Sequence, residues 1–222
     1  MNLKAVATLL ALPLLAACAP QVESTIYLTD VHKVLEDGQA LATPALLRIP
    51  QSGEDDCKKG LADLVAKIAT LTPVTGKGKC ISKDGDQLAE IETSVQIVTP
   101  SSAIDPVNLF TLVAGAADAN GNIPLSFHVL KSLDEIAKAI APDDHTASDF
   151  TPTKFILHIN NDGRDAATLT PGEVFADGEP HLAGGDPVTI QRRTEVEIRL
   201  SDVAASFTEK GNNYVFATLA TK

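Results

Sequence analysis

The sequence predicts an α+β fold with mainly antiparallel sheet and three short-to-medium helices packed on one face. Three observations support this prediction. Several segments alternate apolar and polar residues, which is typical of half-buried strands. An Asn120-Gly121 pair lies between two apolar runs, as in a tight hairpin. Only three short segments have apolar residues at helical spacing, and strands grouped with few helices favour antiparallel pairing. The expected order is ββαβ, ββαβ, βαβ.

In the first half of the chain, the pattern predicts three strands and one helix. Residues 54–71 carry apolar side chains on one helical stripe, so we expect a helix with one buried side. Pro44 interrupts an extended run, which favours an edge position or a bulge there. The expected strands are residues 26–35, 40–49 and 87–99, and residues 75–83 are expected to form a loop.

In the second half, the Asn-Gly turn joins two expected strands. A capping box at residues 132–135 predicts a short helix, and Ser201 predicts the start of another. Residues 161–186 are rich in glycine, proline and acidic residues, so a long loop is expected. The expected strands are residues 107–116, 123–130, 153–160, 188–200 and 214–219.

Proline and serine at residues 100–102 form the best candidate boundary in the chain. The boundary predicts an N-terminal α+β subdomain at 25–99 and a C-terminal one at 103–222. One domain and two domains are both compatible with this pattern.

The composition excludes some partners. There are 29 Asp and Glu against 18 Lys and Arg, and the formal net charge is −11. An acidic surface repels phosphate, so nucleic acid is not expected as a partner. No motif for a nucleotide, a cofactor or a nucleophilic site is present, and the sequence predicts a protein without cofactor or enzymatic activity. An envelope enzyme with an unrecognised site is the alternative.

The first residues have the three parts of a secretory signal: Lys4, an apolar run and small residues before Cys18. The segment Leu15-Ala16-Ala17-Cys18 resembles the lipobox of bacterial lipoproteins. The resemblance implies a signal peptide at 1–17, a lipid on Cys18 and a tether at 18–24. Ala19 follows the cysteine instead of aspartate, which by the same resemblance implies the outer membrane, on the periplasmic side. Small lipoproteins of phages and prophages, some of which exclude related phages, have a similar overall appearance.

Two cysteines remain if Cys18 carries the lipid. An even pair in an oxidising envelope is expected to form a disulfide, and Cys57 falls on the buried stripe of the helix at 54–71. Cys80 precedes the strand at 87–99. A redox role is the alternative, but no C-x-x-C motif is present.

The most regular strands have continuous polar sides. These sides form either a surface for an envelope partner or a merely solvated face. The residues concerned are Glu90, Glu92, Gln96, Arg193, Glu195, Glu197 and Arg199.

The acidic loop at 161–186 supplies a second hypothesis, binding of an ion or small ligand. Asp162, Asp165, Glu173 and Asp177 are its weak candidate metal ligands, although no calcium-loop pattern is complete there.

Overall fold

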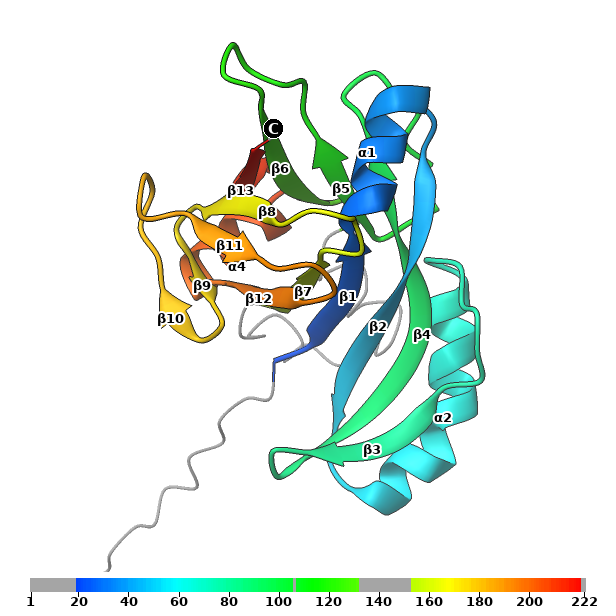
Figure 1. Cartoon of the computed structure of the whole chain (residues 1–222). Coiled ribbons are helices and arrows are strands. Elements are labelled where there is room, and N and C mark those ends of the chain that lie inside the picture. Colours follow the sequence, from blue (N-terminus) through cyan, green and yellow to red (C-terminus); the bar gives the residue numbers. More distant parts are fainter. Residues whose placement is uncertain (1–18, 106, 132–152, 221–222) are drawn as a thin grey trace, which may run out of the picture.

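The computed structural model describes residues 19–105, 107–131 and 153–220. Within them, thirteen strands form one curled sheet, and three helices lie against it (Figure 1). The fold is therefore mostly β, a half-barrel of mixed strands, and the predicted α+β fold with mainly antiparallel sheet is wrong. Cys18 and the predicted helix that starts at Ser132 lie outside the described residues.

The elements are bounded as follows. The first six are β1 (Gln21–Tyr27), α1 (Leu28–Asp37), β2 (Leu41–Gln51), α2 (Glu54–Ala69), β3 (Lys79–Lys83) and β4 (Asp86–Val98). The others are β5 (Phe110–Ala114), β6 (Asn122–Val129), β7 (Lys154–Asn160), β8 (Ala167–Pro171), β9 (Val174–Ala176), β10 (Glu179–Pro180), β11 (Val188–Ile190), β12 (Glu195–Leu200), α4 (Asp202–Glu209) and β13 (Tyr214–Ala220).

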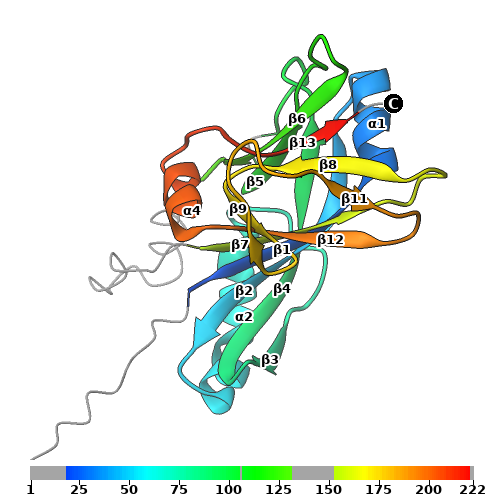
Figure 2. The same ribbon diagram turned by 60° about the vertical axis from the view of Figure 1, so that its left-hand side comes forward.

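The strand order is β10-β9-β12-β7-β1-β2-β4-β5-β6-β13-β8-β11, and β3 pairs with β4 off this path. Two pairs, β1 with β7 and β4 with β5, are parallel and make the sheet mixed. The sheet curls so far that β8 and β9, near its opposite ends, follow one another in the chain (Figure 2). At Gly172 between them, a Cβ would lie 3.0 Å from the Val215 carbonyl oxygen, so glycine permits this close approach to β13.

One hydrophobic core lies along the sheet and includes the buried sides of the described helices. Phe110, Phe127 and Phe155 are fully buried, and their ring centroids lie 5.0 to 5.9 Å apart. Such aromatic contacts add to the stabilisation from buried apolar area. Both sequence halves contribute to this core and to one hydrogen-bonded sheet, since β4 pairs with β5 and β1 with β7.

The structure differs from the predicted strand at 26–35. The chain enters the sheet at Gln21, within the predicted tether, and turns into α1 after Tyr27. Leu28, Val31 and Val34 are all buried at a spacing of three residues, which fits a helix face better than a strand. The Asp162 carboxylate accepts hydrogen bonds from the Thr29 backbone N–H and hydroxyl, so a distant residue caps this helix.

Two predicted loops contain strands, and one predicted strand is broken. Residues 75–83 include β3, and residues 161–186 include β8, β9 and β10. The expected strand at 188–200 is instead β11, a turn and β12. Arg193 has a φ of 61° in that turn, where Arg193 N–H donates to the Asn161 carbonyl. Strands of two to five residues are too short to show a clear alternation of apolar and polar residues, so they cannot be recognised from the sequence.

Several predictions are confirmed. The helix at 54–71 is α2, the strand at 87–99 is β4, and β5 and β6 form the antiparallel hairpin. Ser201 caps α4 through a bond from Ala204 N–H. The disulfide between Cys57 and Cys80 is present, with Cα atoms 6.0 Å apart, and it joins α2 to β3.

The disulfide is predicted to stabilise the protein by about 3.4 kcal/mol, because it closes a loop of about 24 residues in the unfolded chain. The variant Cys57→Ala/Cys80→Ala should lose about that much free energy of unfolding in urea titrations. Reduction of the wild type should give the same loss. An unfolding midpoint that is unchanged in both would contradict this role of the crosslink.

Candidate functional site

Strand register brings the two predicted polar strand sides to one face of the sheet. Arg199, Ile156, Glu23, Leu46 and Glu92 pair in turn across β12, β7, β1, β2 and β4. Paired residues point to the same side of a sheet. The neighbouring row, which includes Val22, Leu47 and Ile91, is buried in the core on the other side. We call the side that bears Glu23 and Glu92 the polar face.

An ionic cluster crosses the polar face over six strands. Its members are Glu23 (β1), Arg48 (β2), Lys79 and Lys83 (β3), Glu90 (β4), His158 (β7) and Glu195 (β12). Arg48 lies at its centre. Its Nε donates to Glu90 Oε2 at 2.7 Å, and its Nη1 donates to Glu23 Oε2.

Arg48 and Glu90 are buried although they lie on the outer side of the strands. Each side chain is only 6% exposed. Lys79 Nζ, 2.8 Å from Glu90 Oε1, supplies a second positive charge to that carboxylate. A buried charge is tolerated when it is paired and hydrogen-bonded, and both conditions hold here.

His158 extends the ionic cluster to the next strands. Its Nδ1 lies 3.3 Å from Glu195 Oε1, and its Nε2 lies 3.8 Å from Glu23 Oε1. One imidazole thus stands between two carboxylates from β1 and β12. The cluster therefore ties together strands that are distant in sequence.

The charges shift one another's pKa values. Burial raises the pKa of Glu23, but the hydrogen bond and charge of Arg48, with Lys83 and His158, outweigh it and the pKa is lowered. For Glu90, burial again opposes Lys79 and Arg48, and its pKa is also lowered. Burial lowers the pKa of Arg48, but both glutamates raise it above its usual value. All three groups are thus held in their charged forms at neutral pH.

The polar face is concave at this cluster. Strands β3 and β1 are separated by β4 and β2, which corresponds to about 14 Å in a flat sheet. Yet Lys83 Nζ lies 3.4 Å from Glu23 Oε2. The contact indicates that the β3–β4 hairpin bends over this side of the sheet, which agrees with the curved β2 and β4 in Figure 1.

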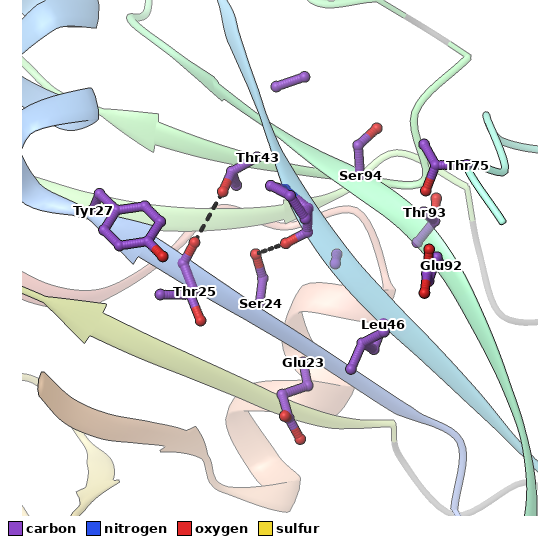
Figure 3. A pocket seen from close by; sticks show the side chains of 13 residues that line it. Glu23, Ser24, Thr25, Tyr27, Thr43, Leu46, Thr75, Glu92, Thr93 and Ser94 are labelled. Atoms are coloured by element: carbon purple, nitrogen blue, oxygen red, sulfur yellow. Dashed lines mark hydrogen bonds between the residues drawn. The ribbon is translucent and has the colours of Figure 1, made fainter. Parts of the chain in front are cut away.

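A groove opens beside the ionic cluster where β1 and β2 separate (Figure 3). The two strands pair only from Gln21 to Ser24 on β1. Beyond that point the Ser24 hydroxyl donates to the Pro44 carbonyl, and the Thr43 hydroxyl donates to the Thr25 carbonyl, both at 2.9 Å. The Pro44 carbonyl faces β1, and proline has no N–H to donate beside it. Pro44 thus sits in an internal strand, at a local edge created by the separation.

The groove has a volume of about 620 Å³, enough for a small molecule or several side chains of a partner. Its lining includes the apolar groups of Tyr27, Pro44 and Leu46, and the hydroxyl groups of serine and threonine residues. Glu92 lies at one side of the groove, next to Thr75, and Glu23 lies at the lower end in Figure 3. Within the described part of the chain, the Glu92 carboxylate accepts no hydrogen bond, although Lys79 contributes a nearby positive charge.

The predicted polar residues have different roles. Glu90 is buried in the ionic cluster and is not a solvated surface residue, because Arg48 and Lys79 bind it. Gln96 accepts a hydrogen bond from Asp105 N–H through its side chain. Arg193 lies in the turn before β12 and does not share the strand face. Glu92 lines the groove, and Glu195 contacts His158. The guanidinium carbon of Arg199 lies 4.7 Å from the centroid of the Phe175 ring. Glu197 lies opposite His158 in the sheet.

The weak metal candidates do not come together. Asp162 caps α1, and Asp177 accepts a hydrogen bond from Glu197 N–H. Among the described residues, Asp165 and Glu173 accept side-chain hydrogen bonds through their backbone carbonyls, from Asn161 and Tyr214. Among the described residues, no group of three or more His, Cys, Asp or Glu side chains is placed to hold a metal ion.

Sequence reasoning missed Arg48, Glu23 and His158. One signal was available: Arg48 is a charged residue inside the apolar run Leu46–Ile49, where an unpaired charge would be costly. Its partners could not be named, because they depend on the register of β1, β2 and β4.

Comparison with known proteins identifies a family. A sequence profile described as a domain of unknown function, DUF7424, matches residues 20–222. The chain belongs to this family. No curated protein matches it, and no solved structure matches it. The family match covers the sheet, the ionic cluster and the groove. No helix among the described residues is both long and apolar enough to span a bilayer.

Replacing Arg48 should destabilise the protein strongly. Arg48→Met leaves Glu90 buried beside one lysine and removes the main partner of Glu23, so we expect a loss of about 3 kcal/mol in the free energy of unfolding. Arg199→Met is the matched control, since Arg199 is exposed and its only described side-chain contact is with Phe175. The control should lose less than about 1 kcal/mol in the same denaturant titration. Equal losses would rule out the central role of Arg48.

The Arg48 effect should also depend on pH. Lowered native pKa values for Glu23 and Glu90 mean that the unfolded chain binds protons more readily. The contribution of these two carboxylates to the free energy of unfolding is therefore complete above the ordinary glutamate pKa. It is lost as the pH falls through their pKa values in the folded protein. The stability difference between wild type and Arg48→Met should shrink from pH 7 to pH 3. A difference that stays constant over this range would contradict the ionic origin of the effect.

Proposed function

We propose that this DUF7424 protein is a lipid-anchored binding protein of the bacterial envelope, and that its groove holds a segment of a partner protein. The groove on the concave polar face is the observation that carries the binding role. Concave sites with apolar walls and a few fixed polar groups are the usual form of binding sites in proteins.

The groove chemistry favours a partner segment with an apolar side chain next to a basic one. Tyr27, Pro44 and Leu46 offer apolar contact, whereas the carboxylate of Glu92 has no hydrogen-bond donor within the described residues. The whole chain carries a formal net charge of −11, which favours a basic partner at long range as well. Charge complementarity of this kind speeds association and selects partners.

The anchor proposal depends on the segment Leu15-Ala16-Ala17-Cys18 and on its position just before the family domain. The family match starts at residue 20, two residues after the cysteine, and β1 starts at Gln21. At about 3.3 Å per residue, Glu23 and Tyr27 lie at most about 16 and 30 Å along the chain from Cys18. The groove would then open close to the membrane, where it could meet another envelope protein.

The anchor is tested by Cys18→Ser expressed in the native host. The wild type should fractionate with the membrane, because two or more acyl chains bind stably. The variant should be recovered in the soluble envelope fraction with its Cys57–Cys80 disulfide intact. A variant that stays in the membrane fraction would refute attachment through Cys18.

The groove is tested with a photo-crosslinking phenylalanine analogue at Tyr27, and with the same probe at Lys33 on α1 as control. We expect the Tyr27 probe to capture one defined envelope protein that the Lys33 probe does not capture. Ala42→Arg places bulk and positive charge in the groove and should abolish capture, while Ala62→Arg on the exposed side of α2 should not. Capture that survives Ala42→Arg, or that occurs equally from Lys33, would exclude the groove as the binding site.

A further inference from the structure

Helix α4 presents two large apolar side chains to solvent. Ala204, Ala205 and Thr208 face the protein, whereas Val203 and Phe207 are 81% and 47% exposed. Residues four apart lie on the same side of a helix, so these two form one outward stripe. Single exposed apolar residues are common, and the stripe is informative only through its position.

Hydrogen bonds place α4 close to the start of the described chain. The Pro20 carbonyl accepts a bond from Lys154 N–H at the start of β7. The preceding residue, Thr153, donates its N–H to the Glu209 carboxylate at the end of α4. Figure 2 shows α4 and the start of β1 on the same side of the molecule.

These contacts bring Phe207 within reach of a membrane that holds Cys18. Cys18 is two residues from Pro20, at most about 7 Å. Phe207 is two residues from Glu209 on the helix, a rise of about 3 Å. Lys154 and Lys210 are exposed at this end, beside the half-buried Glu209 carboxylate that Thr153 N–H binds, and Asp202 lies at the other end of α4. Basic residues beside an apolar stripe are typical of a surface that lies in the headgroup region of a bilayer.

We propose that the Val203–Phe207 stripe of α4 inserts into the lipid surface beside the anchor and fixes the orientation of the domain on the membrane. This inference depends on the proposed lipid on Cys18. A single flexible attachment would let the domain rotate, whereas a second contact holds one side against the bilayer. The groove, on β1, β2 and β4, would then keep a constant direction relative to the membrane.

The test uses the lipidated protein in phosphatidylcholine vesicles whose acyl chains are brominated and quench tryptophan. The chain has no tryptophan, so Phe207→Trp supplies a single probe, and Lys33→Trp on α1 supplies the matched control. Flotation of the vesicles is measured on the same samples. We expect both variants to float with the vesicles. The tryptophan fluorescence of Phe207→Trp should be mostly lost in brominated vesicles relative to unbrominated ones, whereas that of Lys33→Trp should be unchanged.

The two readouts separate the two proposals. If the proteins float and Phe207→Trp keeps its emission, the α4 contact is wrong and the anchor stands. If both probes are quenched equally, insertion is not specific to α4 and the orientation is refuted. If neither variant floats, the anchor fails, and the α4 inference fails with it.

Discussion

Arg48 lies between Glu23 and Glu90, and the shape of the polar face depends on this contact. The guanidinium donates from different nitrogens to carboxylates on the strands either side of β2. Because the side chains are buried, loss of one partner would leave an uncompensated charge. The arrangement therefore fixes the relative position of β1, β2 and β4. Lys79 and Lys83 attach the β3–β4 hairpin to the same carboxylates and hold it over the concave side.

The groove is a consequence of how β1 and β2 part beyond this cluster. Up to Ser24 the two strands are joined by the sheet, and beyond it β1 continues with β7 while β2 continues with β4. Pro44 has no N–H to offer to β1, and the hydroxyls of Ser24 and Thr43 bridge the gap instead. The ionic cluster on one side and the separation of two strands on the other leave a groove in the sheet, and Thr75 from the segment between α2 and β3 lies at its side.

The sequence predicts those parts of the structure that depend on near neighbours. The stripe of α2, the alternation of β4, the Asn-Gly hairpin and the even pair of cysteines all carry their signals within a few residues. The fold class was wrong because curl and parallel pairing depend on contacts between distant segments, such as β1 with β7. The strand predicted at 26–35 was wrong because its β-branched residues fit a helix that Asp162 caps from 133 residues away. The candidate surface was found in part: Glu92 and Glu195 were named, but Arg48 was not.

The central claim is that the ionic cluster folds the β3–β4 hairpin over the polar face. A double-mutant cycle between Lys83→Met and Glu23→Gln tests it most directly, through free energies of unfolding in low salt. In a flat sheet these residues would lie too far apart to interact, and their effects would add. We predict a coupling free energy of about 0.5 kcal/mol or more, as for a half-exposed ion pair. Strictly additive effects would contradict the concave cluster.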